Sequence, residues 1–221
     1  MPHKSLIKTI LPIACLALIV SCGTKSKYDD DDIEDDTYES SSRNNKNRNE
    51  STSPKVELMP VSAECAWTLK SQTGKSYHPM QMFDGNNATC WSSNLNEIAA
   101  DCDVRWGPTI DFGREVYLEE IRMTNGYAKD YQTWNNNARV AGLIIFDADK
   151  GYDFEDDDIT ENLLFRCHPK DIMNQQTLKA LPGASSKKVR RVGLGFTNIN
   201  TGIKFDDLCI SELKFIGHPA D

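Results

Sequence analysis

Oxygen donors gather in the short stretch from Asp84 to Thr89, which reads Asp-Gly-Asn-Asn-Ala-Thr. Asp84 offers a carboxylate, Gly85 can adopt a positive φ, and Asn87 and Thr89 add amide and hydroxyl oxygens. Oxygen ligands of this kind suit Ca²⁺, and an ion held here would have a structural role. An ordinary Asx turn without an ion fits the same residues. The stretch therefore predicts either a structural Ca²⁺ site or a plain hydrogen-bonded turn.

A second group of residues is suited to sugar hydroxyls rather than to a metal. Tyr127, Tyr131 and Trp134 stand among Asn, Gln, Lys and Asp in one polar loop, where aromatic rings can stack on a pyranose. Asn136 and Arg139 supply donors and acceptors for hydroxyl groups. In the alternative interpretation the asparagines cap the loop and Arg139 pairs with a nearby acid. The loop is our candidate ligand-binding site.

Strands must hold both groups in place, because β-branched and aromatic runs dominate the chain after residue 100. Clusters of Gly, Asn, Asp and Pro separate these runs, and two of them alternate apolar and polar residues with period two. The pattern predicts an all-β, antiparallel jelly-roll β-sandwich. The expected strands are residues 109–112, 116–124, 140–146, 163–167, 189–197 and 209–216.

Three short motifs resemble one family. They are Phe-Asp-Gly-Asn-x-x-Thr-x-Trp at residues 83–91, Asn-Gly-Tyr with a later Asn-Asn-x-Arg at 125–139, and Asp-x-Cys-Ile-Ser-Glu-Leu at 207–213. Together they resemble the NADase-type glycan-binding domain, a discoidin-like, galactose-binding-like jelly roll, over about residues 63–217. The chain reads Arg-Trp-Gly-Pro-Thr at 105–109, where the family often has a Gly-Glu pair, so no role tied to that glutamate is expected.

The resemblance adds residues to both candidate sites. It implies that Glu212, from the closing strand, joins the Ca²⁺ site, although Glu212 also fits a plain exposed strand position. It places Trp91 where such folds fill the core, with sugar stacking as the alternative role. It also singles out Asp171 and either Gln175 or Gln176. Modules of this class usually recognise carbohydrates or surfaces rather than catalyse reactions.

The rest of the composition excludes several functions. His78, His168 and His218 each stand beside a proline, outside any nucleophile or zinc-protease motif, so we expect no enzyme activity. The formal net charge of −8 argues against nucleic acid or an anionic lipid surface as the partner.

The first 21 residues resemble a bacterial lipoprotein signal peptide. Two lysines precede an apolar run at residues 10–20 that is too short for an ordinary membrane span, and a lipobox-like Ser-Cys pair follows. The resemblance implies acylation of Cys22, and the alternative is a buried helix that contains a cysteine. Residues 22–58 then form a disordered acidic and polar linker, and the folded domain is expected at 59–221.

This N-terminal region predicts a location in the bacterial cell envelope. A lipid anchor at Cys22 would hold the protein on a membrane, which we expect to be the outer membrane. The acidic run at residues 29–36 resembles the surface-export signals of some Gram-negative lipoproteins, and its alternative role is a solvated spacer.

The cysteines allow disulfides in an exported protein. Of seven cysteines, Cys15 lies in the signal and Cys22 would carry lipid, which leaves five and so at most two bridges. Their spacing matches no zinc motif. The connectivity does not follow from sequence, and a loop bridge between Cys90 and Cys102 is favoured because both flank one polar segment.

These features predict a noncatalytic, lipid-anchored module that presents a glycan-binding β-sandwich at the cell envelope. Its partners would be a glycan or polysaccharide, and a membrane through the lipid anchor alone. The alternative is a structural or protein-interaction module of an envelope assembly.

Overall fold

The computed structural model describes residues 54–70, 73–98, 100–101, 104–151 and 161–221. The predicted signal peptide, Cys22 and Cys102 lie outside these residues, as does the linker up to residue 53. Within the described part of the chain, no helix is both long enough and apolar enough to cross a membrane.

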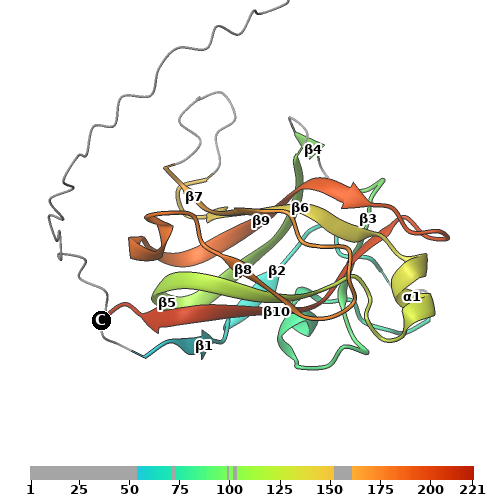
Figure 1. The fold of residues 1–221 in the computed structure, drawn as a ribbon. Helices are drawn as coiled ribbons and strands as arrows, with labels where there is room; N and C mark the ends of the chain where they lie inside the picture. Colours follow the sequence, from blue (N-terminus) through green and yellow to red (C-terminus); the bar gives the residue numbers. More distant parts are fainter. Residues whose placement is uncertain (1–53, 71–72, 99, 102–103, 152–160) are drawn as a thin grey trace, which may run out of the picture. The chain divides into compact units, whose positions relative to one another are not determined.

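The predicted all-β fold is confirmed, and each expected strand falls within a strand of the structure (Figure 1). The expected strands at 109–112 and 116–124 are one long strand, because Gly113, with φ 71°, lets the chain continue through an irregular segment between them. The strands that contain the predicted runs are β5 (Val104–Asn125), β6 (Arg139–Asp147), β7 (Leu163–Cys167), β9 (Lys188–Asn200) and β10 (Asp207–Pro219).

Several shorter elements complete the fold. The short strands contain two to four residues each, so pairing with neighbouring strands, rather than their own composition, determines their conformation. They are β1 (Val56–Leu58), β2 (Ser62–Glu64), β3 (Trp91–Asn94), β4 (Ala100–Asp101) and β8 (Gln176–Lys179). The helical elements are α1 (Tyr131–Asn136), between β5 and β6, and two 3₁₀ helices at Pro79–Phe83 and Ala184–Ser186.

Strand β5 takes part in both layers of the sandwich. Its residues 116–124 pair with β10, and its residues 105–117 pair with β9, always antiparallel. The strand order is β1-β10-β5-β9-β6-β7, with β8 and β2 also on β5 and β3 on β10. Figure 1 shows β6, β7 and β9 above β10 and β1, with β5 running between the two levels.

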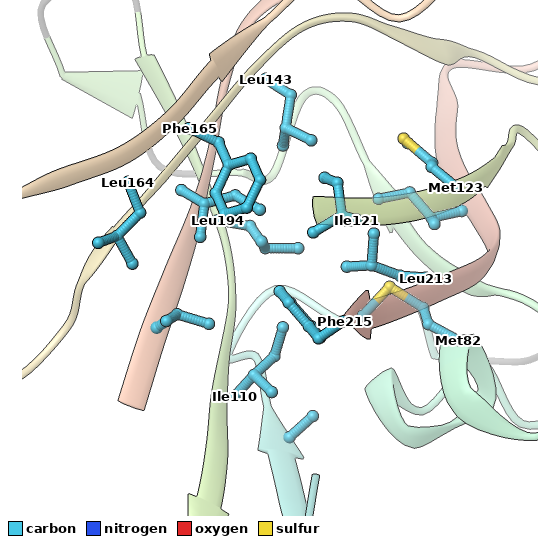
Figure 2. Packing of buried hydrophobic residues seen from close by; sticks show 14 of the residues in the cluster. Met82, Ile110, Ile121, Met123, Leu143, Leu164, Phe165, Leu194, Leu213 and Phe215 are labelled. Atoms are coloured by element: carbon cyan, nitrogen blue, oxygen red, sulfur yellow. The ribbon is translucent and has the colours of Figure 1, made fainter. Parts of the chain in front are cut away.

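The space between the layers is filled by large apolar side chains (Figure 2). Trp91 and Phe196 are fully buried and stack with their ring centres 5.7 Å apart. Phe215, from β10, meets Phe112 of β5 edge to face at 5.1 Å. Fully burying one such side chain contributes about 1.5–3 kcal/mol to folding, so these contacts fix how the two layers face each other.

The folded part begins earlier than the sequence interpretation placed it. Residues 56–58, assigned to the linker, form strand β1, whose Val56 pairs with Gly217 near the end of the chain. A three-residue strand carries almost no compositional signal, so its assignment depended on a partner about 160 residues away.

Candidate functional site

The Asp84 turn is tied to the last strand by Glu212. Asp84 follows the 3₁₀ helix at Pro79–Phe83, and its carboxylate accepts the backbone N–H of Asn86 at 2.9 Å and the hydroxyl of Thr89 at 2.7 Å. The Glu212 Oε1 accepts the same Asn86 N–H at 2.7 Å. The structure therefore places three of the four predicted Ca²⁺ ligands, Asp84, Thr89 and Glu212, at one turn.

The fourth predicted ligand, Asn87, lies beside them. Asn87 and Glu212 line a cavity of about 350 Å³ together with Gly85, Thr124, Ala128 and Lys214. The backbone oxygen of Asn87 accepts the Ser211 hydroxyl at 3.4 Å, which joins the turn to β10 a second time.

One carboxylate oxygen of Glu212 has no hydrogen-bond partner among the described residues, and a cation bound there would interact with it. The residue is 4% exposed, and within the described residues its Oε2 is buried without a hydrogen-bond partner. Burial, with the neighbouring Asp84 carboxyl adding to it, raises the pKa of Glu212 to about 7 against the opposing backbone bond from Asn86. Two carboxylates with neutral oxygens nearby form a donor set that suits Ca²⁺.

The acidic groups at this turn are few. Among the described residues no group of three or more His, Cys, Asp and Glu side chains is placed to hold a metal. A cation at the Asp84 turn would therefore depend on amide, hydroxyl or backbone oxygens for its remaining ligands, as Ca²⁺ does in many proteins.

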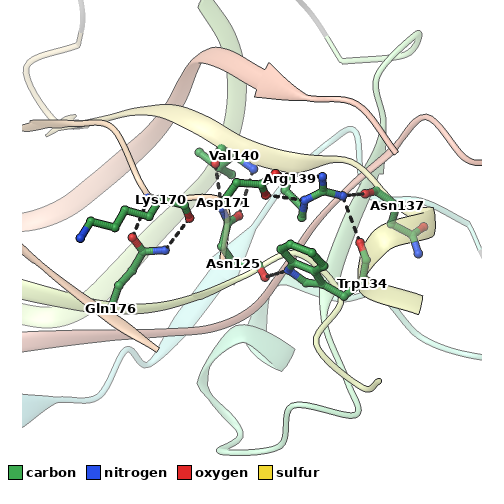
Figure 3. A network of polar contacts seen from close by, with 8 residues as sticks. All are labelled: Asn125, Trp134, Asn137, Arg139, Val140, Lys170, Asp171 and Gln176. Atoms are coloured by element: carbon green, nitrogen blue, oxygen red, sulfur yellow. Dashed lines mark hydrogen bonds and ion pairs between the residues drawn. The ribbon is translucent and has the colours of Figure 1, made fainter. Parts of the chain in front are cut away.

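Several residues of the motif at 125–139 form a buried polar network rather than a ligand surface (Figure 3). The Asn125 side chain donates to the Val140 carbonyl at 2.7 Å and accepts the Val140 N–H at 3.0 Å, as a neighbouring strand would. Gly126 has φ 76°, and a Cβ there would lie 2.8 Å from the Trp134 and Arg139 side chains, so only glycine fits. The Asn-Gly motif thus positions the aromatic loop.

The Arg139 side chain forms its hydrogen bonds within this network. Its guanidinium forms two bonds to Asp171, at 2.6 and 3.1 Å, and donates to the carbonyls of Trp134 and Asn137. Only 6% of Arg139 is exposed, so the structure supports the alternative in which this arginine pairs with an acid. Gln176, the other motif residue, exchanges two hydrogen bonds with the Lys170 backbone at 2.7 and 3.0 Å.

The aromatic residues of the predicted ligand loop separate into buried and exposed ones. Trp134 is 7% exposed, and its indole N–H donates to the Asn125 carbonyl at 2.9 Å. Tyr131 is 67% exposed, with its ring centre 5.9 Å from that of Trp134. The sequence analysis placed Trp134 among the candidate sugar-stacking residues of a polar loop, but Asp130 caps α1 at Thr133, and Trp134 is the buried residue of this short helix.

Of two further predicted ligand residues, Trp91 is buried in the core and Asn136 has its backbone oxygen bonded within the fold. Trp91 lies in the core, as the sequence interpretation favoured, and its indole N–H donates to Thr68 at 3.3 Å. The Asn136 backbone oxygen accepts the N–H groups of Lys204 and Phe205 at 3.2 and 2.9 Å. These bonds bring the segment before β10 against α1.

Tyr127 lies at a second and larger cavity. Its hydroxyl donates to the Ala88 carbonyl at 3.0 Å, and its side chain lines a cavity of about 520 Å³. We call this space the aromatic cavity. It is lined by Leu69, Lys70, Thr73, Tyr77, Ser92, Asn94, Tyr127, Thr133, Asn137, Phe205, Asp207 and Cys209.

Sequence reasoning did not assign Tyr77, Phe205 or Asp207 to a ligand site. Tyr77 lies far from Phe205 and Asp207 in the chain, and the bonds from Asn136 to Lys204 and Phe205 hold the segment before β10 against α1. One signal was present, since Phe205 is a large aromatic between Lys204 and two aspartates, and an exposed aromatic in such a setting is typical of binding surfaces.

The cysteine arrangement differs from the favoured bridge. The four cysteines in the described residues, Cys65, Cys90, Cys167 and Cys209, are free thiols. Contact with the Cys209 thiol, together with burial, raises the pKa of Cys90, while Cys102 lies outside the described residues. Because Cys90 is a free thiol in the structure, the favoured bridge to Cys102 is not formed there.

The chain is a two-layer antiparallel β-sandwich of jelly-roll type, with a cavity lined in part by its loops. A family model described as the NAD glycohydrolase translocation F5/8 type C domain matches residues 52–216, and the chain belongs to this family. No curated protein matches it.

Solved structures share the fold at low sequence identity. A family 32 carbohydrate-binding module of a Clostridium perfringens family 89 glycoside hydrolase, in complex with GalNAc-β-1,3-galactose, is 16% identical, with TM-score 0.50, over 72% of this chain and 99% of that one. The C-terminal domain of a Bacteroides fragilis chitobiase is 16% identical, with TM-score 0.49, over 76% of this chain and 100% of that one. Truncated AlyQ, with CBM32 and alginate lyase domains, is 13% identical, with TM-score 0.46, over 76% of this chain and 34% of that one.

Proposed function

We propose that the chain is a noncatalytic glycan-binding module. The aromatic cavity carries this proposal, because Tyr77, Tyr127 and Phe205 line it together with the polar groups of Asn137 and Asp207. Apolar rings with a few polar groups are what a cavity needs to hold the C–H face and the hydroxyls of a sugar. Membership of a family whose fold is shared by carbohydrate-binding modules supports the same assignment.

The ligand site in this proposal is the aromatic cavity and its rim. Tyr127 keeps the role that the sequence suggested, and exposed Tyr131 is available on the neighbouring helix α1. Trp91, Trp134 and Arg139 instead support the site from within, because each is buried and bonded to other residues. Single sites of this kind bind sugars weakly, at roughly micromolar to millimolar Kd, or about −8 to −4 kcal/mol.

The Asp84 turn would add a structural Ca²⁺ ion to this module. The ion would hold Asp84 and Glu212 together, which fixes the turn to β10. It would also steady Tyr127, because the tyrosine hydroxyl is bonded to Ala88 in the same turn. Its role is to stabilise the folded state rather than to take part in a reaction.

The N-terminal sequence supports a lipid anchor at Cys22 on a bacterial envelope membrane. In that arrangement the acidic and polar linker serves as a spacer between the membrane and the binding module. The module would reach a glycan or polysaccharide of the envelope or of its surroundings.

A glycan array and a polysaccharide pull-down with the full chain test the binding function. Phe205→Ala should weaken sugar binding without unfolding the protein, since Phe205 is 43% exposed and lines the aromatic cavity. Ile203→Ala is the matched control, because Ile203 is 74% exposed and lies outside the cavity. Equal binding by both variants and the wild type would move the site elsewhere.

A second function, binding of an envelope protein, is supported by the outer face of this region. Tyr131, Ile203 and Phe205 are all exposed and lie on two segments that are bonded to each other through Asn135 and Asn136. Exposed apolar residues grouped in this way are typical of protein contact sites. Saturable protein binding without any response to sugars would favour this second function.

A further inference from the structure

Asp207 presents a carboxylate to the aromatic cavity that the fold leaves unpaired. The residue begins β10, pairs with Asn94 of β3, and uses its backbone oxygen to accept the Ala138 N–H at 2.9 Å. Within the described part of the chain, its side-chain carboxylate receives no hydrogen bond and no ion pair. Partial burial removes some of the water from this carboxylate, as its raised pKa indicates, and a ligand that donates hydrogen bonds to it makes up this deficit.

The charges around the cavity determine which kind of ligand the Asp207 carboxylate favours. Lys70 and Asp207 are the only charged residues that line the cavity within the described chain, and Lys70 is exposed at its rim. Burial raises the pKa of Asp207, and the nearby carboxylates of Asp206 and Glu97 raise it further. The region near Asp207 therefore favours neutral hydrogen-bond donors and disfavours a second anion.

The chemical form of the best donor follows from the shape of a carboxylate. Its two oxygens can accept two hydroxyl groups side by side, and two adjacent hydroxyls on a sugar ring provide that pair. Tyr77, Tyr127 and Phe205 line the same space and offer apolar surface to the ring carbons.

On the proposed glycan-binding function, we infer that the aromatic cavity recognises neutral sugars through a vicinal diol bound by Asp207, and that it discriminates against uronic acids. Asp207 is thus the specificity-determining residue of the site, and the aromatic side chains supply contact area. The Asp207 carboxylate accepts both hydroxyl hydrogens, and no bond is formed or broken.

Matched sugar pairs test the inference with the full-length protein. Chemical-shift titration or calorimetry would compare galactose with galacturonic acid, glucose with glucuronic acid, and mannose with mannuronic acid. Within at least one pair, the wild type should bind the neutral sugar more tightly, by roughly tenfold. Asp207→Asn should lower the affinity for the neutral sugar by a similar factor. It should also reduce the difference in affinity between the neutral sugar and the corresponding uronic acid.

Asp206→Asn is the matched control, because Asp206 is the adjacent, exposed acid and does not line the cavity. It should change the affinity for neutral sugars by less than about threefold. A protein that binds sugars with unchanged affinity in Asp207→Asn, or that prefers the acidic member of each pair, would overturn the inference while leaving the glycan-binding function in place. Absence of binding to every sugar of the panel and to every glycan on an array would reject both.

Discussion

The guanidinium carbon of Arg139 lies 4.3 Å from the centre of the Trp134 ring. The same guanidinium is held by two bonds to Asp171, so a cation, an aromatic ring and an acid from three segments form one stack. Stacking of this kind contributes about 0.5–2 kcal/mol, with the larger values at desolvated sites. Because α1 carries Trp134, the stack determines where the loop that contains Tyr127 and Tyr131 can lie.

Removal of Asp171 should therefore destabilise the domain. Asp171→Ala leaves the buried Arg139 charge without its partner, and we expect a loss of about 3 kcal/mol in unfolding free energy, measured by denaturant titration. Asp149→Ala is the matched control, because its pair with Arg191 is nearly half exposed on both sides. That variant should lose less than about 1 kcal/mol. Equal losses in the two variants would show that the burial of Arg139 gives its pair with Asp171 no special role.

Two loop aromatics should respond differently to truncation. Trp134→Ala removes a buried ring and its bond to Asn125, and should destabilise the fold by about 3–5 kcal/mol. Tyr131→Ala should change stability by less than about 0.5 kcal/mol, since its side chain is largely exposed. Thermal melting followed by circular dichroism separates the two outcomes. A large loss in Tyr131→Ala would mean that α1 depends on the exposed ring.

Calcium should stabilise the domain through Glu212. Saturating Ca²⁺ should raise the Tm of the wild type relative to chelated protein, because the ion binds the folded state. Glu212→Gln should remove that rise. In chelator at pH 8 the same variant should melt higher than the wild type, by roughly 2–8 °C, because a neutral amide replaces a buried carboxylate that has no partner for Oε2.

The control for this experiment is Glu64→Gln, which changes an exposed glutamate on β2 in the same way. It should leave both melting temperatures unchanged. A wild-type Tm that is the same in Ca²⁺ and in chelator would reduce the Asp84 stretch to an ordinary turn.

The ionisation of Glu212 should also affect how the stability of the domain depends on pH. The folded-state pKa of Glu212, about 7, lies above its ordinary value of 4.5. In chelator, the contribution of Glu212 to the free energy of unfolding is therefore fully present below about pH 4.5, where the group is protonated. That contribution is lost as the pH rises through about 7. Bound Ca²⁺ favours the ionised carboxylate and should flatten the profile. Denaturant titrations between pH 5 and 8, with and without chelator, measure the difference, and parallel profiles would contradict it.

Anchoring is a separate prediction that depends on the sequence before the described residues. Cys22→Ser should prevent lipidation and release the protein from the membrane fraction, since a single uncharged serine cannot carry the thioether-linked lipid. Membrane fractionation and mass spectrometry of the mature N-terminus would measure this. A Cys22→Ser protein that still sediments with membranes would place the anchor elsewhere.

The fold could be predicted further than the site. Period-two alternation in runs such as 210–216 reports a buried face locally, and every strand expected on this basis is present. The burial of Trp134 and Arg139 could not be predicted in this way, because it depends on Asp171, which lies 32 residues beyond the arginine. The bond between Asn86 and Glu212 joins residues 126 positions apart, and only the family resemblance suggested it.

The aromatic cavity is the clearest case of what sequence patterns omit. Tyr77, Tyr127 and Asp207 have no common spacing, and they meet where the start of β10, paired with β3, lies beside the loops that carry the two tyrosines. Of the residues proposed from the sequence for sugar contact, Tyr127 lines this cavity, whereas Arg139 is enclosed by its own partners.

The pairing of β1 with β10 bears on how the domain can be isolated. Strand β1 covers residues Phe215–Gly217 of β10, opposite the side that β5 occupies. A fragment that begins at residue 59, the predicted start of the domain, would lack β1 and leave those backbone N–H and C=O groups unpaired at a sheet edge. Open edges of this kind recruit strands from other molecules. A fragment that begins at residue 54 keeps the edge covered and is the better choice for structure determination and binding assays.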